Sequence, residues 1–179
     1  MHVLFVCNEN VARSQEAEKF FVSSAAELSP GSDRYTAASA GVDVRVGRSL
    51  DPLVVEVMRE VGYEMDHAFR KVITTSMVDE ADLVISFKPR DELPAFVNNA
   101  KAFRYWPVPD PRGQSLEFHR ENRDRIAKLV GELVSELTGR SGEEITGLAD
   151  DCWTSRTERS LRVFFNPHWD FQLQKSRLE

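Results

Sequence analysis

Residues 3–14 read Val3-Leu4-Phe5-Val6-Cys7-Asn8-Glu9-Asn10-Val11-Ala12-Arg13-Ser14. The short apolar run before Cys7 is rich in β-branched residues, which favours a buried strand over a helix. A helix is expected to begin near Arg13, because apolar residues then recur at helical spacing as far as Pro30-Gly31. These residues are Ala17, Phe20, Phe21, Ala25 and Leu28. Cys7 and Arg13 therefore stand at the two ends of a loop that leads from a strand into a helix.

The rest of the chain continues this alternation of strands and helices. Further strands are expected at residues 35–42, 83–87 and 103–108. A helix is expected to start at Asp51-Pro52 and to end at Gly62, because Asp is a good cap and Pro suits the first turn. A long helix is expected around residues 126–137, where apolar side chains share one face. The alternation predicts an α/β fold with a parallel sheet covered by helices on both faces.

One α/β domain is expected over residues 1–138, and residues 139–179 are expected to form a C-terminal extension. Gly139, Ser141 and Gly142 have the composition of a linker, and the extension is rich in aromatic residues. We expect the extension to pack on the domain as an added helix and tail. The alternative is a segment for partner binding or self-association, since exposed aromatic side chains often mark interfaces.

Composition and charge argue against several classes of protein. The 179 residues carry a net charge of −6, which argues against sequence-independent binding to nucleic acid or to an anionic membrane. No apolar run approaches the roughly 20 residues that span a bilayer. The two cysteines, Cys7 and Cys152, cannot build a disulfide framework, so a reducing, cytoplasmic location is expected.

The loop between Cys7 and Arg13 has the features of an anion site. Its backbone N–H groups can turn inward, and the helix that follows adds the positive end of its dipole. Arg13 can close the ring with two parallel hydrogen bonds to a tetrahedral dianion. That positive field favours the thiolate of Cys7, which is the nucleophilic form. The candidate substrate-binding residues are Asn8, Glu9, Asn10, Val11, Ala12 and Ser14.

The Cys-x5-Arg spacing is a weak signal by itself, and a buried structural cysteine at a strand end is the alternative. The strand before the loop, the helix after it and the Ser14 hydroxyl beside Arg13 favour a nucleophile. Cys7 and Arg13 are therefore the first two candidate catalytic residues.

Asp110, in Val108-Pro109-Asp110-Pro111, is the candidate general acid that protonates a leaving group. Asp-Pro commonly marks only a turn. Asp110 follows the last predicted strand, however, and ligands of parallel sheets lie beyond the carboxyl ends of the strands. Cys7, Arg13 and Asp110 can perform such chemistry alone, so no metal and no cofactor are expected.

These motifs together resemble the low-molecular-weight protein tyrosine phosphatase superfamily, which includes related arsenate reductases. The resemblance covers about residues 2–138, and the matching motifs are Val3 to Cys7, Arg13-Ser14-Gln15, Ala17-Glu18, Ser39-Ala40-Gly41, Asp51-Pro52, the stretch from Asp66-His67 to Ile73-Thr74, and Asp110-Pro111. It implies a four-stranded parallel sheet flanked by helices. It also implies Cys7 as nucleophile, Arg13 as phosphate clamp and Asp110 as acid and then base.

The resemblance further implies that Asn10 and Ser39 hydrogen-bond to each other and support the loop. Four positions depart from the tyrosine phosphatase pattern or narrow the substrate. Glu9 replaces a glycine, and its side chain is expected to point outward; Ala12 replaces a cysteine that could protect the nucleophile by a disulfide. Arg112 replaces an aromatic wall of the pocket, which weakens the case for phosphotyrosine. Val11 stands where phosphoarginine phosphatases carry threonine, which disfavours phosphoarginine.

Three functions are compatible with these residues. The first is hydrolysis of phosphate monoesters, on a phosphorylated protein such as a phosphotyrosine protein or on a small phosphate ester, through a phosphocysteine. The second is arsenate reduction with an external small thiol, since residues 86–90 lack the cysteines that thioredoxin-coupled reductases use. The third is a non-catalytic phosphate-binding or scaffold protein that uses its aromatic extension for partners.

Overall fold

The computed structural model describes residues 1–28, 33–65 and 67–139. Four parallel strands form one sheet in the order β2-β1-β3-β4. They are β1 (His2–Cys7), β2 (Thr36–Gly41), β3 (Leu83–Ser86) and β4 (Phe103–Tyr105). The four-stranded parallel sheet is therefore confirmed, and the strand that ends at Cys7 lies in its interior.

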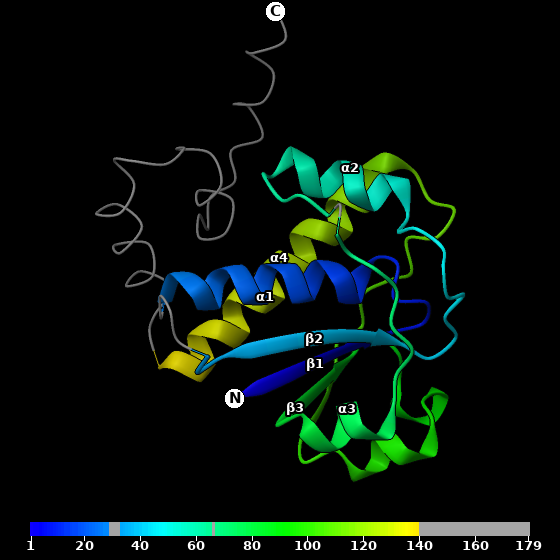
Figure 1. Ribbon diagram of the computed structural model, residues 1–179. Coiled ribbons are helices and arrows are strands. Elements are labelled where there is room, and N and C mark those ends of the chain that lie inside the picture. The colour runs from blue at the N-terminus through cyan, green and yellow to red at the C-terminus, as the bar shows by residue number, and fades with distance from the viewer. Residues whose placement is uncertain (29–32, 66, 140–179) are drawn as a thin grey trace, which may run out of the picture.

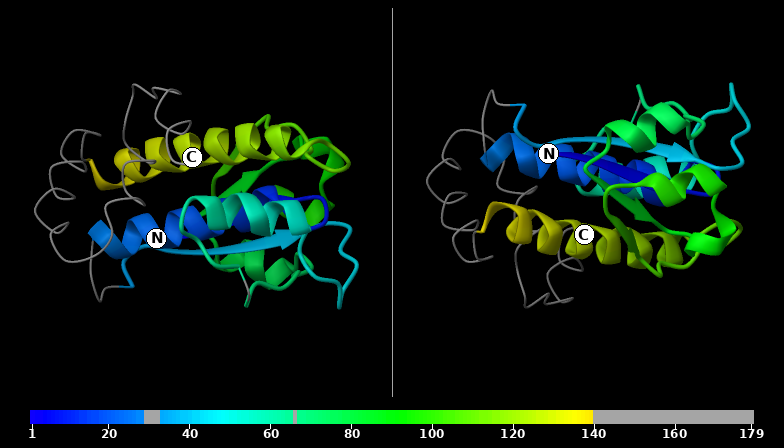
Figure 2. Two further views of the ribbon diagram at one scale, coloured as in Figure 1. Left: turned by 90° about the horizontal axis from the view of Figure 1, so that it is seen from above. Right: turned by 90° about the horizontal axis from the view of Figure 1, so that it is seen from below.

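Helices cover both faces of the sheet, as predicted (Figure 1). On one face lie α1 (Arg13–Leu28), α2 (Pro52–Glu60) and α4 (Leu116–Thr138). On the other lie α3 (Thr75–Glu80) and the 3-10 turns η1 (Arg90–Glu92) and η2 (Ala95–Asn99). Figure 2 shows α1 and α4 running side by side along the first face.

The side chains of β1 supply the centre of both cores. Val3 and Phe5 pack in the cluster under α1, α2 and α4, whereas Leu4 and Val6 pack in the cluster under α3. All four side chains are fully buried. A strand covered on both faces needs apolar residues at every position, which explains why residues 3–6 form a continuous apolar run.

Local sequence determines where the helices begin. The Asp51 side chain accepts a hydrogen bond from the Leu53 N–H at 3.0 Å, and Pro52 occupies the first turn of α2, as predicted. Ser115 caps α4 in the same way, accepting from the Phe118 N–H at 3.2 Å. Gly139 follows α4 with a φ of 67°, a left-handed conformation that suits glycine.

Two elements differ from the sequence-based prediction. Helix α3 has six residues, too few for an apolar period to be read, and it begins at a Thr74 cap that accepts from the Met77 N–H. Strand β4 ends at Tyr105 although the apolar pattern continues to Val108. Pro107 and Pro109 have no N–H to donate to a ladder, so the chain leaves the sheet there.

The sequence-based predictions for the extension mostly concern residues outside the described part of the chain. Packing on the domain and self-association both fall on residues 140–179. Within the described residues, no helix is long and apolar enough to cross a membrane.

Glu16 is a fully buried carboxyl in the first turn of α1. Burial raises the pKa of Glu16 to about 8, although the guanidinium groups of Arg123 and Arg13 act to lower it. The unfolded chain ionises this group near its ordinary pKa of 4.5, so the unfolded state binds fewer protons than the folded state between the two values. Folding stability therefore falls as the pH rises through this interval, by ~1.4 kcal/mol per pH unit for a single group.

Replacing Glu16 by Gln is expected to remove this loss, because the amide does not titrate. Urea unfolding at about pH 5 and about pH 8 measures the free energy of unfolding of both proteins. The wild type should lose more stability than Glu16→Gln on going to the higher pH. Equal losses of unfolding free energy in the two proteins would contradict a buried Glu16 that keeps its proton in the folded state.

Candidate active site

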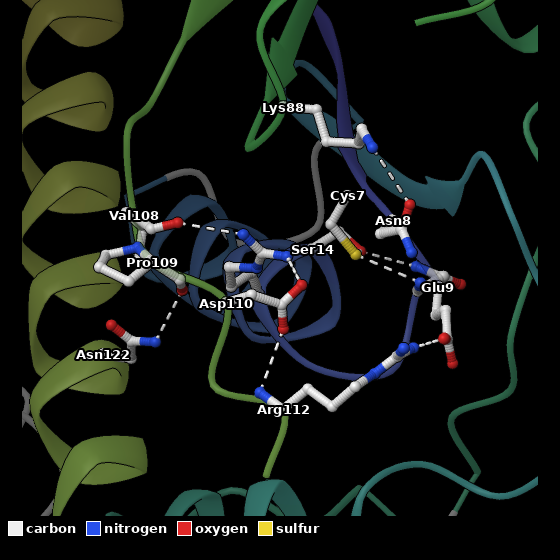
Figure 3. A network of polar contacts seen from close by, with 12 residues as sticks. Cys7, Asn8, Glu9, Ser14, Lys88, Val108, Pro109, Asp110, Arg112 and Asn122 are labelled. Atoms are coloured by element: carbon white, nitrogen blue, oxygen red, sulfur yellow. Dashed lines mark hydrogen bonds and ion pairs between the residues drawn. The ribbon is translucent and has the colours of Figure 1, made fainter. Parts of the chain in front are cut away.

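Cys7 ends β1 at the carboxyl edge of the sheet, and α1 begins at Arg13, so residues 7–14 form the expected strand-loop-helix unit, here called the Cys7 loop. The Cys7 side chain is 3% exposed. Its Sγ lies 3.0 Å from Ser14 Oγ and accepts a hydrogen bond from the Asn10 N–H at 3.2 Å (Figure 3). Both contacts suit a thiolate, which accepts hydrogen bonds more strongly than a thiol.

Asn10 holds the Cys7 loop in its curved shape. Its φ is 53°, a left-handed conformation that asparagine tolerates better than most residues. Its side-chain Nδ2 donates to Ser14 Oγ and to Ser39 Oγ, both at 2.9 Å, and the second bond is the contact that the family resemblance implied. Because Nδ2 can only donate, Ser14 Oγ accepts there and keeps its own hydrogen for Cys7 Sγ. The Asn10 amide therefore orients the hydroxyl that faces the sulfur.

A second layer of polar residues supports Asn10 from outside the loop. Its Oδ1 accepts from the Lys71 N–H at 2.7 Å and from Gln15 Nε2 at 2.9 Å. Ser39 Oγ donates to Glu18 Oε2 at 2.5 Å, and Lys71 Nζ donates to the same oxygen at 2.9 Å. Sequence reasoning found Ser39 but assigned no role to Lys71, although Lys71 lies in the stretch from Ile73-Thr74 back to position 66 that resembles the family. Lys71 reaches the loop because residue 71 lies beside the end of β2.

Gly41 lets the end of β2 approach the Cys7 loop closely. A Cβ at this position would lie 2.7 Å from the Asn10 N and 2.8 Å from the Asn8 O, both backbone atoms that cannot rotate away. Glycine is therefore required at position 41 because no side chain fits between the two backbone segments. Its own backbone conformation does not require glycine.

Gly41→Ala is expected to push the Cys7 loop out of shape and to weaken the binding of inorganic phosphate by about tenfold or more, since each hydrogen bond to a charged group contributes ~1.5–3 kcal/mol. Titration calorimetry with phosphate measures the change, and circular dichroism checks that the sheet persists. Unchanged phosphate affinity in a folded Gly41→Ala protein would rule out this role for the glycine.

Arg13 and Asp110, 97 residues apart in the chain, meet at one edge of the sheet. One Arg13 nitrogen donates to the Val108 carbonyl at 3.0 Å, and the other contacts Asp110 Oδ2 at 2.5 Å. The Arg13 side chain is 7% exposed and that of Asp110 is 52% exposed, so the carboxylate lies at the mouth of the site. The Arg112 N–H donates to Asp110 Oδ1 at 3.1 Å, and Asn122 of α4 anchors the Pro109 carbonyl (Figure 3).

The Glu9 side chain does not point outward, which corrects the sequence-based expectation. It is 10% exposed and forms ion pairs with Arg70, at 3.4 Å, and with Arg112. Figure 3 shows Arg112 reaching from the loop of Asp110 toward Glu9. The two guanidinium groups offset the negative charge that would otherwise repel an oxyanion beside Cys7. Neither arginine could be assigned to Glu9 from sequence, because the contacts span 61 and 103 positions.

A pocket of about 560 Å³ opens beside the Cys7 loop. It is lined by Glu9, Val11, Ala12, Gly47, Arg48, Ser49, Leu50, Asp51, Pro52, Arg70, Asp110, Pro111 and Arg112. Three of the predicted loop residues and Asp110 therefore share this cavity. Asn8 faces another direction, where Lys88 Nζ donates to its Oδ1 at 3.3 Å. Among the described residues, no group of three or more His, Cys, Asp or Glu side chains could hold a metal ion.

Comparison with known proteins agrees with this fold. The model of the family described as low molecular weight phosphotyrosine protein phosphatase matches residues 2–141. A glutaredoxin arsenate reductase of Synechocystis is 31% identical over 137 residues, which are 76% of this chain and 98% of that protein.

Two solved structures share the architecture. A mutant of an arginine phosphatase superposes with a TM-score of 0.69 at 25% identity, covering 77% of this chain and 96% of that chain. A low molecular weight protein tyrosine phosphatase from T. tengcongensis superposes with a TM-score of 0.63 at 28% identity, covering 76% and 99%. With a family match over nearly the whole described domain, this chain belongs to the low molecular weight phosphotyrosine protein phosphatase family.

Proposed function

We propose that this protein is a cysteine-dependent phosphatase that hydrolyses phosphate monoesters, on a phosphorylated protein or a small ester, through a phosphocysteine at Cys7. The observation that supports it best is the setting of Cys7 Sγ, which receives the Asn10 N–H and faces the Ser14 hydroxyl at the start of a helix. These donors favour the thiolate and place it at a positive helix end, where a phosphoryl group also binds.

In the first step the Cys7 thiolate attacks phosphorus, so that an S–P bond forms while the P–O bond to the leaving group breaks. Arg13 donates its two nitrogens to phosphoryl oxygens in place of Val108 and Asp110. Asp110 gives its proton to the leaving oxygen. In the second step Asp110 takes a proton from water, the water oxygen bonds to phosphorus, and the S–P bond breaks to release inorganic phosphate and the thiolate.

Trapping the intermediate tests this proposal. The protein is mixed with para-nitrophenyl phosphate, quenched in acid within milliseconds, and digested for mass spectrometry. A phosphoryl group on the peptide that contains Cys7 is the expected result. Turnover without phosphoryl-Cys7 at any quench time would contradict the mechanism. A panel of phosphotyrosine peptide, phosphoarginine and small phosphate esters then ranks the substrates.

Replacing Asp110 by Asn is expected to lower kcat/KM by ~10²-fold for phenyl phosphate, whose phenolate leaves poorly without a proton. The comparison uses kcat/KM because this quantity reports the first step and excludes the second, which is the same for both substrates. The loss should be much smaller for para-nitrophenyl phosphate, whose leaving group needs little protonation. The ratio of the two losses separates a missing acid from general damage to the site. Equal losses for both substrates would assign Asp110 to positioning of Arg13 alone.

Arsenate reduction is a second candidate, supported by the 31% identical relative named glutaredoxin arsenate reductase. Cys7 is the only cysteine among the described residues, and on this route an external thiol such as glutathione or mycothiol supplies the second sulfur. Cys7 displaces a hydroxyl from arsenate, the external thiol then attacks the sulfur, and the two sulfurs form a mixed disulfide as arsenite leaves with two electrons. Arsenite formation measured with glutathione, glutaredoxin and mycothiol tests this route, and no product with any donor would exclude it.

A further inference from the structure

The pocket beside Asp110 is walled by arginines that come from three separate segments. Arg48 lies between β2 and α2, Arg70 lies between α2 and α3, and Arg112 follows Asp110. Among the described residues that line this pocket, none has an aromatic side chain. A planar, neutral leaving group would therefore find no ring to stack on, whereas an anionic one would find several donors.

The acidic side chains in this pocket already have partners. Glu9 pairs with Arg70 and Arg112, Asp110 pairs with Arg13, and Asp51 caps the N-terminus of α2. The three lining arginines, Arg48, Arg70 and Arg112, are matched in number by three lining carboxylates, and Arg13 adds a further positive charge at Asp110, so the site keeps one guanidinium group in excess.

Of the three described arginines that line the pocket, Arg48 is the one that forms no ion pair with another described residue. It is exposed, and among the described residues no carboxylate lies within ion-pairing distance of it. Burial lowers the pKa of Arg70, and the nearby charges of Arg48 and Arg45 lower it further, which places these three guanidinium groups within one another's field. A cationic wall on a chain with a net charge of −6 is a local feature that favours an anionic ligand.

We propose that the preferred substrates are phosphate monoesters whose leaving group carries a second negative charge, such as a carboxylate, and that Arg48 is the residue that selects them. This inference rests on the proposed phosphatase activity. The phosphoryl group occupies the Cys7 loop, and the leaving group extends past Asp110 into the arginine-walled pocket, where its carboxylate meets the Arg48 guanidinium.

Two matched substrates test the selection, namely 4-carboxyphenyl phosphate and 4-carbamoylphenyl phosphate. They have nearly the same shape and differ in one charge. The carbamoyl group withdraws electrons more strongly than an ionised carboxylate, so a preference for the carboxylated ester cannot come from its leaving group. At low ionic strength the wild type is expected to prefer the carboxylate in kcat/KM by about fivefold, the effect of one partly exposed ion pair. Arg48→Gln should abolish the preference and Arg48→Glu should reverse it, with little change for the carbamoyl ester.

Arg125→Gln is the control for net charge, because Arg125 is exposed on α4 and does not line the pocket. It should keep the preference. An equal kcat/KM for both esters in the wild type, or the same loss in Arg48→Gln and Arg125→Gln, would overturn the proposal while leaving the phosphatase activity established.

A binding experiment separates this proposal from the proposed activity. The two phosphonate analogues of these esters, which cannot be hydrolysed, are titrated into the wild type and Arg48→Gln by calorimetry. Tighter binding of the carboxylated phosphonate to the wild type alone supports the selection even if no ester is hydrolysed. Equal binding of both phosphonates contradicts it, whatever the activity.

Discussion

Replacing Cys7 by Ser is expected to lower kcat for phosphate monoesters by about 10⁴-fold or more, the largest effect of any single change in this protein. A serine hydroxyl stays protonated at neutral pH at this position, because the described groups in contact with residue 7 are hydrogen-bond donors: the Asn10 N–H and the Ser14 hydroxyl. Colorimetric hydrolysis of para-nitrophenyl phosphate measures the loss.

The substitution should leave the loop intact, which makes it a clean test. A serine Oγ can accept from the same two donors, so inorganic phosphate should still bind to Cys7→Ser with an affinity near that of the wild type. Ser14→Ala is the graded control, because it removes one of the two contacts and should cost only about tenfold. Activity within tenfold of the wild type in Cys7→Ser would refute the nucleophile.

Replacing Arg13 by Lys is expected to lower kcat/KM by ~10³-fold, because one ammonium cannot reproduce the two-pronged contact with a phosphoryl group. In the structure the two terminal nitrogens of Arg13 contact two acceptors at the same time, the Val108 carbonyl and the Asp110 carboxylate. Lysine retains the charge, so the loss isolates the fork geometry.

Arg13→Ala is the companion variant, and it should fall only slightly below Arg13→Lys. Thermal unfolding is measured alongside, since Arg13 also ties α1 to the chain that follows β4. A Lys variant with wild-type kcat/KM would show that charge alone suffices. If kcat/KM falls only at temperatures where the variant unfolds, and is normal at low temperature, the role of Arg13 is to stabilise the fold.

Much of the site could be predicted because its central part is local in sequence. The apolar run before Cys7 forms a strand, α1 follows six residues later, and the short loop between them brings the Asn10 N–H to the sulfur. Asp110 could be predicted as well, since both β1 and β4 run in the same direction and deliver their carboxyl ends to one edge.

Other parts of the site depend on contacts between distant segments, and sequence reasoning missed or misjudged them. Glu9 was expected to point outward because an isolated carboxylate would repel an oxyanion. The structure instead supplies Arg70 and Arg112 from two other segments, and their charges make its inward position tolerable. Lys71 and Glu18 support Asn10 in the same non-local way.

The sequence by itself determined the α/β class, the order of the strands along the chain and the position of Cys7 between a strand and a helix. Each follows from hydrophobic period, caps and turn residues, which act over a few neighbouring positions. Only the tertiary structure decided that Glu9 is neutralised, that Gly41 must have no side chain and that Arg48 has no carboxylate partner among the described residues. The reason is physical: ion pairs, close backbone contacts and pocket walls depend on distances in space. Those distances cannot be read from the spacing of residues along the chain.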